Sequence, residues 1–256
     1  MSFHLPFPEP KKSPAVINAE LLDRRILNSF LKRVAADGVE KVQIHNVYGQ
    51  RYIGTGLNYG LEIEVHGTAG NDLGAFMDGP SIVIYGSVQD GCGNTMNNGL
   101  IVVHGQAGDV TGYSMRGGKI FIRDNVGYRA GIHMKEFQSA RPFLVVGGSA
   151  GDFLGEYMAG GVILVLGLNW HHRREFTAKF AGTGMHGGII YIRGEVRHLG
   201  TGAEISDADE DDMGQIGELV KEFCCHFGFD SDRIIGNAFT KVIPSSRRPY
   251  GNLYAR

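Results

Sequence analysis

Residues 182–187 read Gly-Thr-Gly-Met-His-Gly, the G-x-G-x-x-G spacing of a loop that holds the pyrophosphate of a dinucleotide. That chemistry requires the glycines to follow a strand and open a helix, because the phosphate lies on the unpaired amides of the helix N-terminus. Here the glycines precede residues 189–192, a run rich in β-branched residues that predicts a strand. We therefore expect no binding of NAD, FMN or FAD, and the glycines need another explanation.

Carboxylates form a second candidate site. Asn71, Asp90, Asp109 and Asp152 each stand six residues before one of the methionines that recur along the chain. A regular spacing of this kind can align side chains on one face of a fold, and the parallel β-helix enzymes that cleave polysaccharides carry their carboxylates on one such face. Neighbouring carboxylates repel by roughly 1 kcal/mol in water, whereas Asp and Asn readily cap turns by accepting backbone hydrogen bonds. We favour turn caps, and an independent enzyme that uses Asp90, Asp109 and Asp152 stays open as an alternative.

The third candidate site is a charged segment that departs from the repeating pattern of the sequence, which is described below. Asp124 replaces a glycine, and Arg129, His133 and Lys135 follow shortly before an insertion. Regular folds often break their rules where they carry function. These three side chains are an anion or partner site in one interpretation and a solvated bend in the other.

The remaining reactive residue types show no catalytic spacing. The insertion at residues 168–174 holds Trp170 and two adjacent histidines, which on a strand would point to opposite faces, so we expect a loop with an exposed anchor. The cysteines are too few for a disulfide framework, a four-thiolate zinc site or an iron–sulfur site: Cys92, Cys224 and Cys225.

Composition limits the class of protein. The chain has 256 residues, 43% of them hydrophobic and 20% charged, which is enough for a sizeable core. A net charge of −2 favours neither nucleic acid nor an anionic membrane. Neither a long apolar run nor a signal peptide stands out, so we expect a cytoplasmic protein. Glycine is the outlier, with 39 residues, and its abundance indicates a repeat.

A nineteen-residue repeat explains the glycines. Met77, Met96, Met115 and Met134 are each nineteen residues apart, and two further methionines continue the series after insertions of five and eight: Met158 and Met185. In the first unit we assign the methionine position to Asn58. Three residues before each methionine stands a glycine, interpreted as a corner: Gly74, Gly93, Gly112, Gly131, Gly155 and Gly182. Five and seven residues after the methionine position stand β-branched residues, typical of a strand.

Such a unit is too short for a strand and a packed helix, so it predicts one coil of a parallel β-solenoid. We expect about seven coils over residues 41–200, with isoleucine, valine and methionine filling the bore. Residues 1–40 would form an arm and a helix at 19–36, and residues 201–256 a helix at 209–227 and a tail. Each helix would cap one open end of the rod. The acidic run at 207–212 fits a solvated helix start.

One outward column is unexpectedly apolar. The position between the two bore columns reads Glu64 in the first unit and is then apolar or aromatic: Val83, Val102, Phe121, Leu164 and Tyr191. Something must cover so long a stripe. Either a terminal helix of the chain or another protein does so, and we expect a partner face, with self-association or docking of other subunits.

The coils resemble the GXGXG domain, the right-handed parallel β-helix at the C-terminal end of glutamate synthase large subunits. Residues 107–118 and 150–161 are the clearest units, and residues 239–244 resemble the segment that closes those chains. The C subunit of formylmethanofuran dehydrogenase is built from similar coils. The resemblance implies an all-β rod, a single-stranded right-handed parallel β-helix with a capping α-helix at each end.

Glutamate synthases convert glutamine and 2-oxoglutarate into two glutamates, using an amidotransferase domain and an FMN and iron–sulfur domain. The sequence shows neither domain. The resemblance therefore implies a non-catalytic scaffold subunit that joins separate amidotransferase and FMN/iron–sulfur subunits, with no cofactor and no catalytic residue of its own. The open alternatives are a C-type subunit of a formylmethanofuran dehydrogenase-like oxidoreductase and the independent β-helix enzyme.

Overall fold

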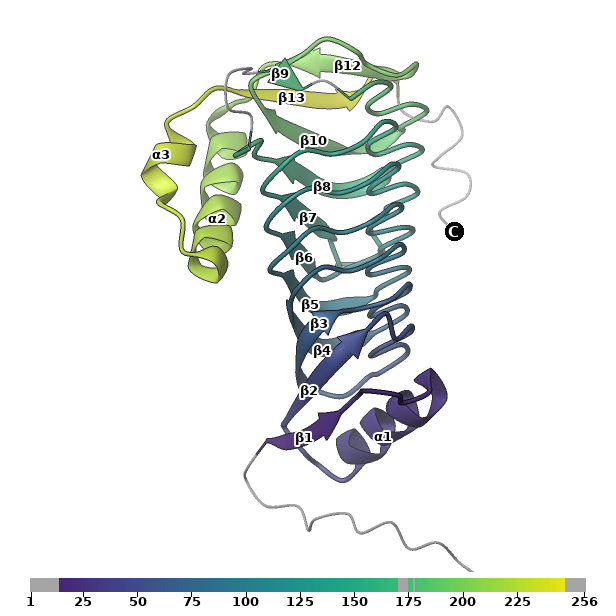
Figure 1. Ribbon diagram of the computed structural model, residues 1–256. Helices are drawn as coiled ribbons and strands as arrows, with labels where there is room; N and C mark the ends of the chain where they lie inside the picture. The colour runs from purple at the N-terminus through teal and green to yellow at the C-terminus, as the bar shows by residue number, and fades with distance from the viewer. Residues whose placement is uncertain (1–13, 170–174, 177, 247–256) are drawn as a thin grey trace, which may run out of the picture.

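The computed structural model describes residues 14–169, 175–176 and 178–246, which form a rod of stacked coils (Figure 1). Within this part of the chain each coil contributes one strand, and the strands pair in parallel in chain order: β2 (Lys41–Tyr48), β3 (Glu62–Thr68), β4 (Asp78–Tyr85), β5 (Asn98–Val103), β6 (Lys119–Ile122), β7 (Phe143–Val146), β8 (Ala159–Val165) and β10 (Gly187–Arg193). The predicted parallel β-helix is confirmed.

The bore is filled as the repeat predicts. The strand register stacks one apolar residue of each coil directly on the next: Ile63, Ile82, Ile101, Ile120, Leu144, Ile163 and Ile190. All of these side chains are fully buried, and the six methionines of the repeat lie in the same core. Burying one such side chain stabilises the fold by about 1.5–3 kcal/mol, so the stack as a whole contributes strongly to the rod's stability.

The first coil corrects the predicted register by one residue. Leu57, and not Asn58, takes the methionine position, because Leu57 is 2% exposed within the core while Asn58 is exposed. Gly54, with a φ of 75°, is the corresponding corner. Ile63 stands six residues after Leu57, whereas Ile82 stands five residues after Met77. Spacing counted back from Ile63 therefore misplaces the corner by one residue.

A helix and a strand close the N-terminal end of the rod. Strand β1 (Ala15–Asn18) pairs in parallel with β2, and α1 (Arg24–Ala36) packs Leu27 and Leu31 into the core of the bore. The predicted helix at 19–36 is shorter than expected, because Asp23 caps its N-terminus by accepting a hydrogen bond from the amide of Arg25. Figure 1 shows α1 across the end of the rod.

Strands close the other end, where we had predicted a helix. Strand β13 (Phe239–Pro244) pairs antiparallel with β10, and β12 (Ala203–Ser206) pairs antiparallel with β13. Beside them lies a two-stranded sheet of β9 (Glu175–Phe176) and β11 (Glu195–Val196). These strands satisfy the hydrogen-bonding edge of β10, so the end needs no helical cap.

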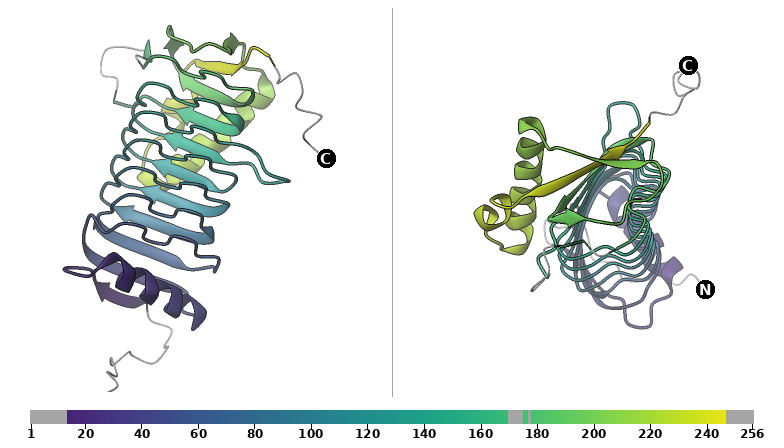
Figure 2. Two further views of the ribbon diagram at one scale, coloured as in Figure 1. Left: turned by 90° about the vertical axis from the view of Figure 1, so that its right-hand side faces the viewer. Right: turned by 90° about the horizontal axis from the view of Figure 1, so that it is seen from above.

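The long C-terminal helix instead lies along the flank of the rod (Figures 1 and 2). Helix α2 (Glu210–Phe227) begins at a capping box formed by Asp209 and Asp212 and ends at Gly228, whose φ is 75°. The short α3 (Ser231–Ile235) follows it and contacts it. The predicted bounds of α2 are nearly right, but its predicted place at the rod end is wrong.

Candidate functional site

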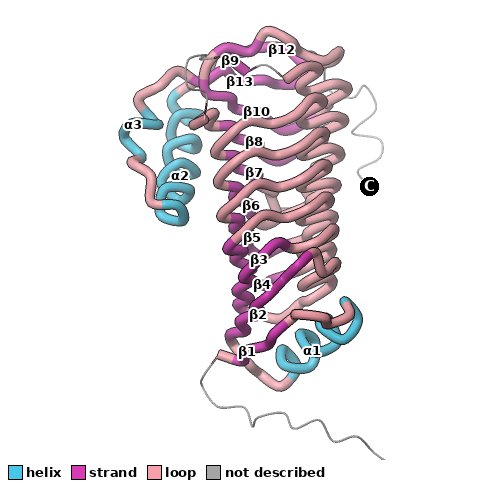
Figure 3. The backbone as a smooth tube through the Cα atoms, in the orientation of Figure 1, coloured by secondary structure: helices cyan, strands magenta, loops and turns pink. Residues whose placement is uncertain are grey.

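The glycine pattern falls in the corner turns, which belong to the loops that connect the strands in Figure 3. In a typical corner Val110, Gly112 and Ser114 have φ values of 50°, 72° and 51°. The amide of Tyr113 donates to the carbonyl of Val110, and that of Met115 to Gly112, so two turns overlap. Turns with positive φ at their third residue favour glycine. All six predicted corner glycines have φ between 65° and 72°, as such a turn requires.

The G-x-G-x-x-G stretch is the corner of the last full coil. Its amides are already engaged, since Gly182 donates to the carbonyl of Leu154 at 2.8 Å and Gly184 to that of Thr201 at 2.7 Å. The strand β10 follows, where a dinucleotide site would need a helix. Stacking of coils therefore explains these glycines.

The aspartate column consists of turn caps. Asp90 accepts a hydrogen bond from the amide of Asp109 at 2.9 Å, Asp109 from that of Tyr128 at 2.8 Å, and Asp152 from that of Lys179 at 2.8 Å. Each carboxylate thus bonds to the backbone of the next coil. The prediction that these side chains accept backbone amides holds for the three aspartates, but the amides belong to the next coil and not to the residue's own turn. This structural role argues against the catalytic alternative for the same side chains.

The fourth coil brings the predicted charged residues to one exposed corner. Arg129 forms an ion pair with Glu156 at 2.8 Å, and the His133 ring stacks on Tyr157 with 5.4 Å between centroids. The side chain of Lys135 is exposed nearby in sequence. Because Glu156 already balances the charge of Arg129, the corner is poorly suited to hold a small anion.

The apolar outward column is covered by the chain itself, which corrects our partner-face prediction. Val102, Phe121, Leu164 and Tyr191 are each at most 1% exposed, while Val83 is partly exposed. Phe121, Leu164 and Tyr191 form one apolar cluster with helix α2. The residues that α2 contributes to it lie on its apolar face: Ile216, Leu219, Val220 and Phe223. Helix α2 takes the place that we had assigned to another protein.

A buried polar cluster fixes α2 to the sheet. The Tyr191 hydroxyl donates to Asp212, whose other oxygen lies 2.6 Å from Lys241 Nζ and accepts the amide of Asp209. Burial and the Asp212 charge raise the pKa of Tyr191. Burial disfavours the Asp212 carboxylate, but its bonds from Lys241 and Tyr191 outweigh that penalty and hold its pKa below the ordinary value. Sequence spacing gave no signal for this cluster, whose members are far apart in the chain.

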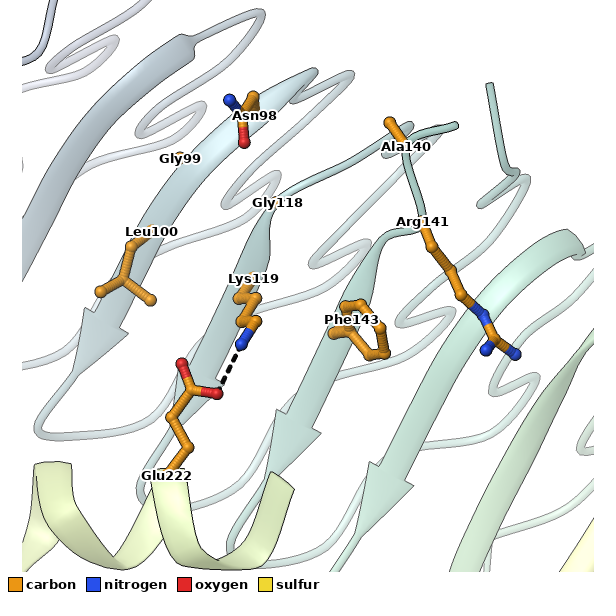
Figure 4. Close-up of a pocket in the computed structure, with 9 residues that line it drawn as sticks. All are labelled: Asn98, Gly99, Leu100, Gly118, Lys119, Ala140, Arg141, Phe143 and Glu222. Atoms are coloured by element: carbon orange, nitrogen blue, oxygen red, sulfur yellow. Dashed lines mark hydrogen bonds and ion pairs between the residues drawn. The ribbon is translucent and has the colours of Figure 1, made fainter. Parts of the chain in front are cut away.

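A shallow pocket lies between α2 and the starts of β5, β6 and β7 (Figure 4). Its volume is about 340 Å³, and its charged walls are paired: Lys119 Nζ lies 2.6 Å from Glu222, and Arg141 Nε 3.0 Å from Glu136, although the latter pair is misaligned for a hydrogen bond. The Phe143 ring lies 5.9 Å from both cationic groups. The lining of this pocket holds no Ser, Thr, Cys or His, and the amine of Lys119 is held in its ion pair with Glu222.

Other reactive groups lie apart. Among the described residues no three His, Cys, Asp or Glu side chains are grouped to hold a metal, and no helix is long and apolar enough to cross a membrane. The three cysteines are free, and burial raises the pKa of Cys92 to about 12. The predicted anchor Trp170, with residues 171–174, lies outside the described part of the chain.

The fold and its corners define a class of protein, the parallel β-solenoids whose corner turns have positive φ at alternate positions and hold glycine at the central one. The family described as the GXGXG motif matches residues 35–246. A protein of Methanocaldococcus jannaschii, described as uncharacterized, is 44% identical over 249 residues, which cover 93% of this chain and 95% of that protein. The chain belongs to the GXGXG motif family, which is the family of domain 3 of glutamate synthase.

Proposed function

We propose that the chain is a non-catalytic scaffold subunit of a multi-subunit glutamate synthase, which makes two glutamates from glutamine and 2-oxoglutarate. Separate amidotransferase and FMN/iron–sulfur subunits would supply the chemistry and the cofactors. The observation that carries the proposal is the extent of the family match. Residues 35–246 include the whole solenoid and the closing strand β13, so the matched domain accounts for nearly all of the described chain.

The site geometry supports a scaffold. The carboxylates of the aspartate column bond to the backbone of neighbouring coils, and Asp212 holds α2 on the sheet. The most polar clusters therefore stabilise the rod. Seven steps of about 4.8 Å between β2 and β10 give a stiff body roughly 34 Å long, which suits a part that keeps two other subunits at a fixed separation.

Affinity purification tests this function. The chain, tagged at its chromosomal locus and expressed at its native level, is recovered from its source organism, and the copurifying proteins are identified and assayed for glutamine-dependent glutamate formation. We expect an amidotransferase subunit and an FMN/iron–sulfur subunit in stoichiometric amounts, together with that activity. Recovery of the chain alone, or with the subunits of another oxidoreductase such as formylmethanofuran dehydrogenase, would contradict the proposal.

A further inference from the structure

The last turn of α2 rests on the sheet through two histidine rings (Figure 1). The His226 ring lies against Phe121 of β6, with 5.0 Å between the ring centroids. Phe227 meets the ring of His104, directly after β5, edge to face at 5.1 Å, and His104 in turn stacks on Tyr85 of β4 at 5.0 Å. One imidazole from the helix and one from the sheet therefore help to hold this end of α2 in place.

The packing of His226 suits the neutral ring. Its Nε2 atom is buried, and no group in the described part of the chain forms a hydrogen bond with it. A neutral imidazole can leave this nitrogen without a proton, whereas both ring nitrogens of the imidazolium are donors. Protonation of the docked ring would therefore bury a charged donor that has no acceptor, which is costly.

The ionic groups beside His226 do not remove that cost. Glu222, one turn earlier in α2, is paired with Lys119 of β6 at 2.6 Å (Figure 4). Burial of the ring, together with the charge of Lys119, outweighs the attraction of Glu222 and lowers the pKa of His226. The dipole at the C-terminal end of α2 also favours a cation, but this attraction is smaller than the cost of a buried charge without an acceptor.

His104 is disfavoured as a cation in the same way. Burial within the ring stack lowers its pKa, and the charges of Arg123 and of a protonated His226 lower it further. The carboxylate nearest to Arg123 in sequence, Asp124, is already paired with that guanidinium at 2.9 Å. Because a proton on either histidine repels a proton on the other, the two rings respond to acid together.

The other end of α2 is held by groups that keep their charge in mild acid. Asp212 lies 2.6 Å from Lys241 Nζ and accepts the Tyr191 hydroxyl. The pKa of Asp212 is lowered and that of Tyr191 is raised, so neither group changes its protonation state between about pH 5 and pH 7.5. The two ends of one helix thus differ in their response to protons.

We propose that α2 is a proton-sensitive lid, fixed to the sheet at Asp212 and released at its last turn when His226 and His104 are protonated. Opening uncovers the ring of Phe121, which is fully buried in the closed lid. Because docking lowers the pKa of both histidines below the ordinary value of about 6.5, the lid is closed above that pH and opens increasingly below it. The lid belongs to the fold and is independent of the proposed function.

Amide hydrogen exchange of the full chain at pH 7.5 and pH 5.0, followed by mass spectrometry and corrected for the intrinsic pH dependence of exchange, tests the lid. In wild type we expect the opening constant of residues 219–227 to rise about tenfold or more at pH 5.0, because each pKa unit is worth tenfold. Residues 212–216 and the strands beneath them should change little. No rise, or an equal rise along the whole of α2, would overturn the proposal.

A double variant, His104→Phe with His226→Leu, removes both titrating rings. Phenylalanine continues the ring stack between Tyr85 and Phe227, and leucine replaces a ring whose buried nitrogen has no partner, so neither change leaves a polar group unpaired. We expect residues 219–227 of this variant to open equally at both pH values. The matched control His198→Gln, at an exposed histidine after β11, should keep the wild-type rise. A rise that persists in the double variant would overturn the proposal, because another group would then open the lid.

A proton NMR titration of wild type gives a measurement that does not require the double variant to fold. The imidazole C–H signals of His104 and His226 are assigned by the loss of one signal in each single variant. We expect both to titrate below the ordinary pKa of about 6.5. Midpoints at or above that value would overturn the proposal, because the closed lid would then favour the protonated rings.

Discussion

Replacing single glycines with alanine separates two physical reasons for glycine in this rod. At Gly112 the φ is 72°, but an added Cβ would lie 3.7 Å from its nearest neighbour, on Leu144, so only the backbone conformation opposes it. We expect Gly112→Ala to cost about 1–2 kcal/mol. At Gly86 the φ is not in the left-handed region, yet a Cβ would lie 2.0 Å from the carbonyl oxygen of Gly67. Two coils would have to separate, so Gly86→Ala costs the most.

Gly131 combines the two effects and provides a rescue. Its φ is 71°, and an added Cβ would lie 2.3 Å from Cδ1 of Ile163. Gly131→Ala therefore costs the backbone strain and, for the overlap, about 1–3 kcal/mol more. Ile163→Val removes that methyl group at a cost of its own of about 0.5–1.5 kcal/mol. We expect the double variant to be more stable than the sum of the single changes predicts.

Urea denaturation followed by far-ultraviolet circular dichroism measures these costs as shifts of the midpoint at a constant slope. The expected order of destabilisation is smallest for Gly112→Ala, intermediate for Gly131→Ala and largest for Gly86→Ala. Equal destabilisation by the changes at Gly112 and Gly86, or strict additivity of the Gly131 and Ile163 changes, would refute the reasoning from corner geometry.

Three further predictions concern the contact of α2 with the sheet. The double variant Phe121→Lys with Leu164→Lys should lose most of its thermal stability, because both side chains are fully buried in the cluster with α2. The control Val83→Lys changes a partly exposed residue of the same column and should be tolerated. A double variant with the melting temperature of wild type would contradict this burial. Asp212→Asn should lower the free energy of unfolding in urea by about 3–5 kcal/mol, because Lys241 loses its ion-pair partner. Adding Lys241→Met should restore part of that free energy. No recovery in the double variant would contradict the importance of the ion pair. The folded-state pKa of Asp212 is lowered, so the Asp212 carboxylate stabilises the fold at pH values above its unfolded pKa of about 3.9. This stabilisation is lost as the pH falls through the folded-state pKa. The difference in stability between wild type and Asp212→Asn should therefore narrow below about pH 4, and a constant difference would contradict this reasoning.

The rod could be predicted from the sequence because the stacking is direct. In a solenoid, residues one repeat apart become neighbours, so a column of identical residues in the sequence is a column in space. The corner glycines, the bore residues and the aspartate caps were recognised in this way. The first coil was misread by one residue because Leu57 replaces methionine and one extra residue precedes the strand, which spacing alone does not show.

The place of α2 could not be predicted by the same means. The sequence shows an apolar stripe on the sheet and an apolar face on the helix, but periodicity does not say that the two faces pair with each other. The acidic run at 207–212 was interpreted as a solvated helix start, whereas Asp212 is 6% exposed and bonds to Tyr191 and Lys241. These contacts join residues 21 and 29 positions away from Asp212, outside any repeat.

Reconstitution of the enzyme tests the central claim most directly. The purified amidotransferase and FMN/iron–sulfur subunits of the same organism are assayed for glutamine-dependent glutamate formation with and without this chain, and the mass of the assembly is measured in parallel. A scaffold role predicts that adding the chain yields a complex containing all three subunits and raises the glutamine-dependent rate, while the ammonia-dependent rate changes little. Full glutamine-dependent activity without the chain, and no complex in its presence, would contradict the account.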